Sequence, residues 1–352
     1  MAAVKSGSFT SSVVTTLDSW RAFVEHDPEP VTLLTEDELG RLTPAERLTY
    51  DDERGDYHAA LPALKTPILD RTVTKGLLFM RLNRGQQLGT SCGMVLSGVP
   101  GVGKSTAIKA LGRTVERAYR RRNPQMTDAV PVVYITVPTA QHPKALPAEL
   151  LYFLGAPHAA RANETTLAHQ ACQLMADLRT SLVLVDEVHE IDRSRASHDQ
   201  QSDQLKYFMD HIPATFVLAG INVENCGFFT GHRGHQLARR FTPLKASPSN
   251  HSTIAQRQEW AMLIEGFELA LRLHAHKPGS LLPLADYLFG RTGGYIVSLS
   301  HLIREAAIKA ILTGTEHIDK QLLDSVDLDH GATEDAAAER QAVPKTRKRG
   351  KH

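Results

Sequence analysis

The chain has few cysteines, three in 352 residues. Cys92, Cys172 and Cys226 are far apart and odd in number, which excludes a disulfide framework and a close-spaced zinc pattern. The 17 histidines include no H-E-x-x-H motif, so we expect no zinc site. Cysteines that need no pairing suit a reducing cytoplasm.

The chain also lacks an excess of charge of either sign. Lys plus Arg total 40 and Asp plus Glu total 39, so any surface for nucleic acid has to be local. No apolar run approaches the roughly 18 residues needed to cross a bilayer, and residues 1–18 contain no apolar signal core. We therefore expect a cytoplasmic protein without a membrane partner.

One segment specifies a chemistry: Gly98-Val99-Pro100-Gly101-Val102-Gly103-Lys104-Ser105. Its spacing, G-x-x-x-x-G-K-[ST], lets backbone N–H groups surround a phosphate chain while the lysine neutralises its charge and the serine offers an oxygen to Mg²⁺. A short apolar strand is predicted before it, over 93–97, and a helix after it, over 105–121. The phosphate would therefore lie at a helix N-terminus, which favours anions.

Four more apolar segments predict buried strands: 130–137, 181–187, 214–220 and 241–244. Strands that alternate with helices indicate an α/β fold with a parallel sheet covered by helices on both faces. In such folds ligands bind at the carboxyl ends of the strands.

The helical and polar patterns divide the chain into four parts. We expect an N-terminal extension and lead-in over 1–75, with helix starts at Thr35 and Thr43, and an α/β nucleotide-binding domain over 76–250. A small all-helical lid domain follows over 251–330, with helices predicted at 254–276, 281–289 and 297–312. Residues 331–352 form a basic-ended tail that we expect to be disordered.

Two carboxylates end the predicted strand 181–187. Asp186 can hold the Mg²⁺ shared with Ser105, and Glu187 can orient or deprotonate a water molecule. The alternative is a pair of strand-end charges in solvent. Because a phosphate loop precedes the pair with one strand between them, the combination favours a hydrolase.

Other polar residues leave two interpretations open. Asn222, after the fourth strand, could bind a γ-phosphate or simply end a turn. Arg239 and Arg240 could supply an arginine finger to a neighbouring subunit or place cations at a helix C-terminus. A basic stripe on the predicted helix 105–121 is either a solvated face or a surface for phosphates; it comprises Lys109, Arg113, Arg117, Arg120 and Arg121.

Taken in order, these features resemble an AAA+ ATPase, and more narrowly the TniB/TnsC regulators of DNA transposition with the related IstB helper ATPases. The specific residues are Asp186-Glu187-Val188-His189, similar to that branch's D-E-x-H, and Gln236-Leu237-Ala238-Arg239-Arg240-Phe241, similar to its arginine-finger segment. Tyr57-His58 and Lys65-Thr66-Pro67 are similar to its lead-in. The resemblance covers about residues 55–325.

The resemblance implies ATP-driven assembly of a homo-oligomeric ring or filament on duplex DNA, transposase recruitment, and disassembly on hydrolysis. It makes Glu187 the residue that activates water, Asn222 sensor 1 and Arg240 the finger acting in trans. The implied ligands of ATP and Mg²⁺ are Gly98, Val99, Pro100, Gly101, Val102, Gly103, Lys104, Ser105, Thr106 and Asp186, with Ser105 and Asp186 at the metal. The family's DNA contacts would fall near Lys144 and Arg161.

One departure from the family pattern concerns turnover. Gly294-Tyr295-Ile296-Val297 lacks the arginine of a sensor 2 Gly-x-x-Arg sequence. Either Arg291 or Arg304 substitutes for it, or turnover is slow and switch-like. The alternative function is a STAND-like signalling or defence ATPase that uses nucleotide as a conformational switch for protein partners. A metabolic kinase is disfavoured because Glu187 suits water activation.

Overall fold

The computed structural model describes residues 14–26, 30–61, 64–85, 91–137, 144–156, 162–189, 198–225, 229 and 231–328, with the side chains of 198–202 and 231–233 left out. The chain forms two compact units. The α/β unit comprises Met1–His26 and Pro67–Ala246, and the helical unit comprises Asp27–Thr66 and Ser247–His352. The predicted tail, 331–352, lies outside the described residues.

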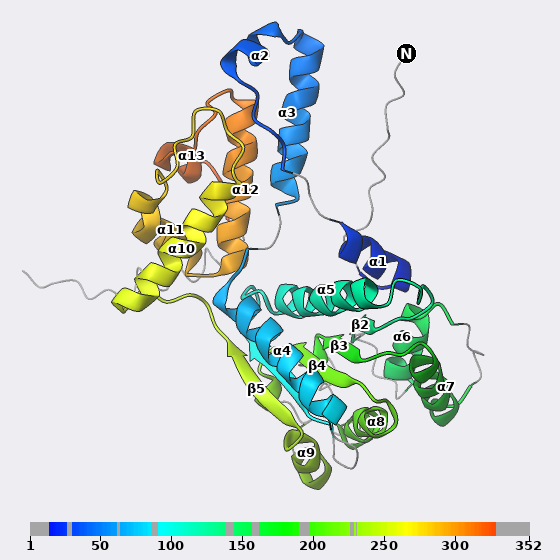
Figure 1. Ribbon diagram of the computed structural model, residues 1–352. Helices are drawn as coiled ribbons and strands as arrows, with labels where there is room; N and C mark the ends of the chain where they lie inside the picture. Colours follow the sequence, from blue (N-terminus) through cyan, green and yellow to red (C-terminus); the bar gives the residue numbers. More distant parts are fainter. Residues whose placement is uncertain are drawn as a thin grey trace, which may run out of the picture. The chain divides into compact units, whose positions relative to one another are not determined.

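A five-stranded sheet forms the centre of the α/β unit (Figure 1). Its order is β2-β3-β4-β1-β5 and all four pairings are parallel, which confirms the predicted fold class. The edge strand β5 contains Pro243, which is tolerated because β5 pairs only with β1. The strands are β1 (Gly93–Gly98), β2 (Val132–Thr136), β3 (Leu182–Asp186), β4 (Thr215–Gly220) and β5 (Phe241–Ala246).

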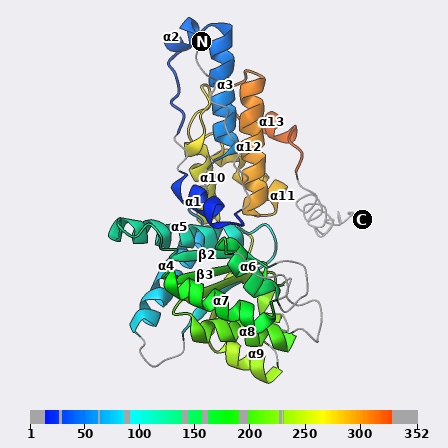
Figure 2. The same ribbon diagram turned by 90° about the vertical axis from the view of Figure 1, so that its right-hand side faces the viewer.

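Helices cover this sheet on two sides (Figure 2). Helix α5 lies on one side, against β2, β3 and β4, and α8 lies on the other. Helix α4 packs along α5 and leads into β1. The helices of this unit are α1 (Leu17–Glu25), α4 (Pro67–Gly85), α5 (Lys104–Arg122), α6 (Ala145–Phe153), α7 (Glu164–Asp177), α8 (His198–His211) and α9 (Gly231–Ala238).

Helix α1 belongs to the α/β unit, whereas the sequence pattern predicts a single N-terminal extension over 1–75. Trp20 is fully buried and its ring stacks on Tyr134 of β2 with centroids 6.0 Å apart. Arg113 and Arg117 of α5 donate hydrogen bonds to the carbonyl of Val24, at 3.3 and 2.8 Å. These cations satisfy a carbonyl in the last turn of α1, where the helix dipole is negative.

The helical unit contains a second core. Thr35, Thr43 and Thr253 each cap a helix through a capping box, and the first two are the predicted helix starts. Helix α10 ends at Ala270, earlier than the predicted 276, and α3 packs against α12. The helices are α2 (Glu36–Arg41), α3 (Pro44–Ala59), α10 (Ile254–Ala270), α11 (Ala285–Thr292), α12 (Ile296–Leu312) and α13 (Lys320–Asp324).

A buried ion pair joins α3 to the segment after α12. Arg54, with no exposed surface, donates to both carboxylate oxygens of Glu316 at 2.7 Å each. Burial acts to raise the pKa of Glu316, but hydrogen bonds from Arg54 and from the His274 backbone outweigh it, so the pKa lies below its usual value. A paired, buried carboxylate of this kind stays ionised at neutral pH.

His58 adds a neutral group to the same core. Its Nδ1 donates to the Arg54 carbonyl at 2.6 Å, and its Nε2 accepts the backbone N–H of Arg272 at 3.0 Å. A neutral imidazole satisfies both contacts, whereas protonation of Nε2 would break the second. Burial, with the nearby Arg54 and Arg272 charges, lowers the pKa of His58 from 6.5 to about 4.

We predict that acidification destabilises the helical unit through His58. The unfolded chain takes up a proton near pH 6.5 and the folded chain only near 4, so stability falls as pH drops between these values. Between pH 6.5 and 5, the unfolding free energy should fall by up to about 2 kcal/mol. In a Trp20→Phe background, fluorescence of Trp260, the other of the two tryptophans, reports this unit.

The control compares two further variants in that background. His58→Gln should flatten the pH dependence, while His301→Gln, on a half-exposed side chain, should leave it unchanged. Equal slopes with and without His58 would contradict the assignment.

Candidate active site

Three polar segments lie at the carboxyl ends of three neighbouring strands. The loop 98–103 follows β1, Asp186 and Glu187 end β3, and Asn222 follows β4. Because β4 pairs with both β1 and β3, Asn222 lies between the loop and the acidic pair. Gly98 and Asn222, which are 124 positions apart in the sequence, thus lie at the same edge of the sheet as Asp186, as the parallel fold predicts.

The loop conformation requires its glycines. Gly101 and Gly103 have φ of 75° and 85°, in the left-handed region. A Cβ at Gly98 would lie 2.0 Å from the carbonyl oxygen of Ala246, so the approach of β5 excludes a side chain there. Helix α5 begins at Lys104 and Gly103 supplies no side-chain cap. Its first N–H groups and the positive end of its dipole therefore suit an anion.

Lys104 is directed across this loop. Its ammonium donates to the carbonyl of Val99 at 2.7 Å, and the residue is 7% exposed. Burial lowers the pKa of Lys104, while the charges of Glu187 and Asp186 act in the opposite direction. The cation is thus held between the loop and the acidic strand end.

Asp186 is the most buried charge of the group, at 2% exposure. The hydroxyl of Tyr134 donates to its Oδ2 at 2.9 Å, and the backbone N–H of Glu187 donates to its Oδ1 at 3.0 Å. Burial, together with the charge of Asp186, raises the pKa of Tyr134, so the phenol remains a donor. Each oxygen keeps a lone pair for a metal ion or its water ligands.

Sequence reasoning missed Tyr134. Its only signal is a polar-tipped side chain in an otherwise apolar strand, 130–137. Lys109, counted there in a basic stripe, has its ammonium 5.0 Å from the Tyr134 ring centroid. The tyrosine is therefore packed between Trp20, Lys109 and Asp186, which fixes its hydroxyl.

Glu187 and Asn222 share an uncommon backbone conformation. Their φ angles are 56° and 45°, and only four non-glycine residues in the described part of the chain have positive φ. Asparagine tolerates this region, but for glutamate it costs on the order of 1 kcal/mol. Such strain concentrates at functional sites, and here it occurs at two adjacent strand ends.

Arg240 lies at the opposite edge of the sheet. Its carbonyl accepts the N–H of Gly93 at the start of β1, and it precedes β5. The length of β1, at roughly 3.3 Å per residue, separates it from the loop of its own chain. Its guanidinium pairs with Asp210 at 2.5 Å, while Arg239 is exposed.

The basic stripe on α5 is largely engaged within the chain. Arg113 and Arg117 bind the end of α1, as described above, and Arg120 pairs with Glu116 at 2.8 Å. Arg120 also donates to three backbone carbonyls. The stripe is therefore neither a uniformly solvated face nor a continuous surface for phosphates.

The remaining predicted cations lie elsewhere. Lys144 is exposed at the start of α6 and donates to the carbonyl of Ala162 at 2.7 Å, whereas Arg161 lies outside the described residues. In the helical unit, Arg291 donates to the carbonyls of Leu323 and Val326. Arg304 donates to the carbonyl of His58 at 3.1 Å.

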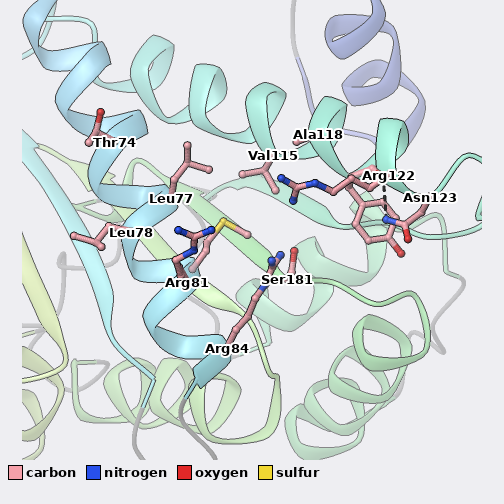
Figure 3. A pocket seen from close by; sticks show the side chains of 12 residues that line it. Thr74, Leu77, Leu78, Arg81, Arg84, Val115, Ala118, Arg122, Asn123 and Ser181 are labelled. Carbon is pink, nitrogen blue, oxygen red and sulfur yellow. Dashed lines mark hydrogen bonds between the residues drawn. The ribbon is translucent and has the colours of Figure 1, made fainter.

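A pocket of about 700 Å³ opens at the edge of the sheet away from the phosphate loop (Figure 3). Arg81 and Arg84 of α4 and Arg122 at the end of α5 line it together with Leu77 and Leu78. Because it borders the last turn of α5 and the residue before β3, it is separate from the candidate site.

Comparison with known proteins identifies the domain. Residues 79–251 match the family model described as "Bacterial TniB protein". Over this region the chain belongs to the TniB family. No curated protein sequence matches the chain. The resemblance to TniB-type AAA+ ATPases inferred from the sequence is thereby confirmed.

Solved structures show the same AAA+ fold for the TniB domain. Aeropyrum pernix ORC2, in ADPNP–ADP complexes, is 15% identical with a TM-score of 0.53, covering 71% of this chain and 66% of that one. Aeropyrum pernix ORC1, in complex with DNA, is 14% identical with a TM-score of 0.55, covering 79% of this chain and 66% of that one. Cdc6p from Pyrobaculum aerophilum is 14% identical with a TM-score of 0.52, covering 82% of this chain and 69% of that one. The chain thus spans about two thirds of their length.

The described residues contain no group of three His, Cys, Asp or Glu side chains arranged for a metal ion. Among the helices that the structure describes, none combines the length and apolar character needed to cross a membrane.

We predict that Tyr134→Phe weakens Mg²⁺-dependent nucleotide binding, because Asp186 loses the donor that orients it. The Mg²⁺ concentration for half-maximal binding of a fluorescent ATP analogue should rise about tenfold. Tyr119→Phe is the matched control. In the part of the chain that the structure describes, the exposed hydroxyl of Tyr119 has one hydrogen-bond partner, the sulfur of Met126 at 3.6 Å. An unchanged Mg²⁺ requirement in Tyr134→Phe would refute this role.

Proposed function

We propose that the TniB-type domain binds ATP with Mg²⁺ and hydrolyses it to ADP and phosphate. The observation that carries the proposal is the meeting of three segments at adjacent strand ends: the loop 98–105, Asp186 with Glu187, and Asn222. The solved ORC2 structure of the same fold is described as ADPNP–ADP complexes, which supports a nucleotide ligand.

The chain's own residues fit a magnesium nucleotide. Backbone N–H groups of 98–106, other than Pro100, bind the phosphates, and Lys104 neutralises their charge. Ser105 and the buried carboxylate of Asp186 hold the metal, directly or through water. When bound, Mg²⁺ neutralises charge that develops on the phosphate oxygens. Tyr134 keeps Asp186 oriented toward that position.

Glu187 activates the attacking water. Its backbone leaves the extended conformation of β3 with a φ of 56°, and its side chain is 40% exposed, whereas Asp186 is buried. A carboxylate accessible to water beside Lys104 can orient the nucleophile and accept its proton. Asn222 donates its amide to the γ-phosphate or accepts from the water.

Arg240 acts on the nucleotide of a neighbouring copy. It is a strand length away from the loop of its own chain, so a role as arginine finger requires a homo-oligomer. Within one chain the guanidinium pairs with Asp210, and in the assembly it would contact the γ-phosphate bound to the neighbouring copy instead. This arrangement couples turnover to ring or filament formation.

We further propose that the assembly binds duplex DNA and regulates transposition by recruiting a transposase. The TniB family match supports this, as does the DNA complex of the structurally similar ORC1. Lys144 and Arg161 are the proposed DNA contacts. Turnover would be slow and switch-like, since no Gly-x-x-Arg sequence is present and both Arg291 and Arg304 bind carbonyls within the helical unit.

A second candidate is a signalling ATPase whose partners are proteins. The observation in its favour is that Arg113, Arg117 and Arg120 are used inside the domain, which reduces the basic surface of α5. A nucleotide-dependent assembly with a protein and no response to DNA would support this function instead.

We predict that Glu187→Gln binds ATP as tightly as the wild type but releases no measurable phosphate. The amide keeps the size of the carboxylate but cannot take a proton. Assemblies with ATP on duplex DNA should therefore persist, and should weaken steeply with salt because their contacts are to phosphates. Phosphate release and filter binding measure both effects. Wild-type turnover in this variant would rule out Glu187 as the base.

We predict that Arg240→Ala lowers turnover only in the assembled state, by as much as ~10³-fold. Arg239→Ala is the matched control, and sedimentation confirms that the assemblies compared are equal in size. If Arg239→Ala shows the loss of turnover instead, Arg239 is the arginine finger. Equal turnover in all three proteins would remove the finger from this segment.

A further inference from the structure

We propose that His189 is a positioning residue that couples Glu187 to the turn carrying Asn222. The proposal rests on the ATPase function above and adds a link between its water-activating and phosphate-sensing groups. The task falls to one nitrogen of the His189 ring, Nδ1.

His189 lies between the two strand ends. Its Nδ1 is 3.2 Å from Oε2 of Glu187, and it accepts the backbone N–H of Ile221 at 3.3 Å. The turn after β3 sits directly on β4: a Cβ at Gly220 would lie 3.0 Å from the Val188 side chain and 3.2 Å from the His189 backbone nitrogen. A side chain at this position would require these neighbours to shift.

The two contacts of Nδ1 have opposite polarity. To accept from Ile221, the nitrogen needs a free lone pair, whereas to attract the carboxylate of Glu187 it needs a proton. One nitrogen cannot do both at once.

Asn222 is held on both sides by backbone groups. Ile221 donates to His189 on the β3 side, and Val223 donates to Oγ of Ser97 at 3.0 Å on the β1 side. Ser97 directly precedes the phosphate loop. When Asn222 engages a γ-phosphate, the shift of its left-handed turn changes the Ile221 contact, and with it the hold of Nδ1 on Glu187.

Three single variants test the positioning role. His189→Ala should lower kcat about 10- to 100-fold, the cost of a misplaced catalytic group, with KM for ATP changed less than about twofold. His189→Asn places a donor or acceptor where Nδ1 lies and should restore most of the rate. His189→Gln, which reaches the Nε2 position, should not.

The outcomes separate this proposal from the ATPase itself. A wild type without phosphate release would count against the proposed function. With an active wild type, an unchanged kcat in His189→Ala, or equal recovery by Asn and Gln, would overturn the positioning role. The Asn and Gln variants are close in size, so their comparison stands even if His189→Ala folds poorly.

A double-mutant cycle tests the coupling. If His189 and Asn222 act as a unit, His189→Ala with Asn222→Ala should lose no more than about the larger single loss. Losses that multiply would show that the two residues act independently and would overturn the link.

Discussion

The parallel pairing of β4 with both β1 and β3 is the constraint on which the candidate site depends. Val217 pairs with Met94 on one side and with Leu184 on the other, and all three are fully buried. A slip of one residue would turn this apolar set to the opposite face of the sheet and disrupt its packing against the helices. Core packing thus sets the register, and the register brings the loop, the acidic pair and Asn222 to one edge.

Much of this arrangement follows from the sequence. Apolar runs with strand character located all five strands, and the glycine–lysine spacing located the loop. The backbone strain at Glu187 and Asn222 could not be predicted, because nothing in local propensity requires glutamate to adopt a positive φ. Tyr134 was missed for a related reason: its role depends on Asp186, on the neighbouring strand.

Long-range contacts explain the other differences. Arg54 and Glu316 are 262 positions apart in the sequence. Trp20 and Tyr134, whose rings stack, are also far apart in the sequence, so no short sequence pattern reveals either pair. The same holds for Arg113 and Arg117, whose charges satisfy a carbonyl of α1 and do not form an open basic surface. A count of cationic residues in the sequence therefore overstates the basic surface available to a nucleic acid, because some of these side chains are hydrogen-bonded within the domain.

We propose above that the three strand ends form one ATP site and that a second copy of the chain completes it. A cryo-electron microscopy reconstruction with a non-hydrolysable ATP analogue, Mg²⁺ and duplex DNA tests it most directly. We expect a triphosphate on loop 98–105, its γ-phosphate beside Glu187 and Asn222, and Arg240 of a neighbouring copy facing it. Nucleotide bound elsewhere, or a phosphate site closed within one chain, would contradict it.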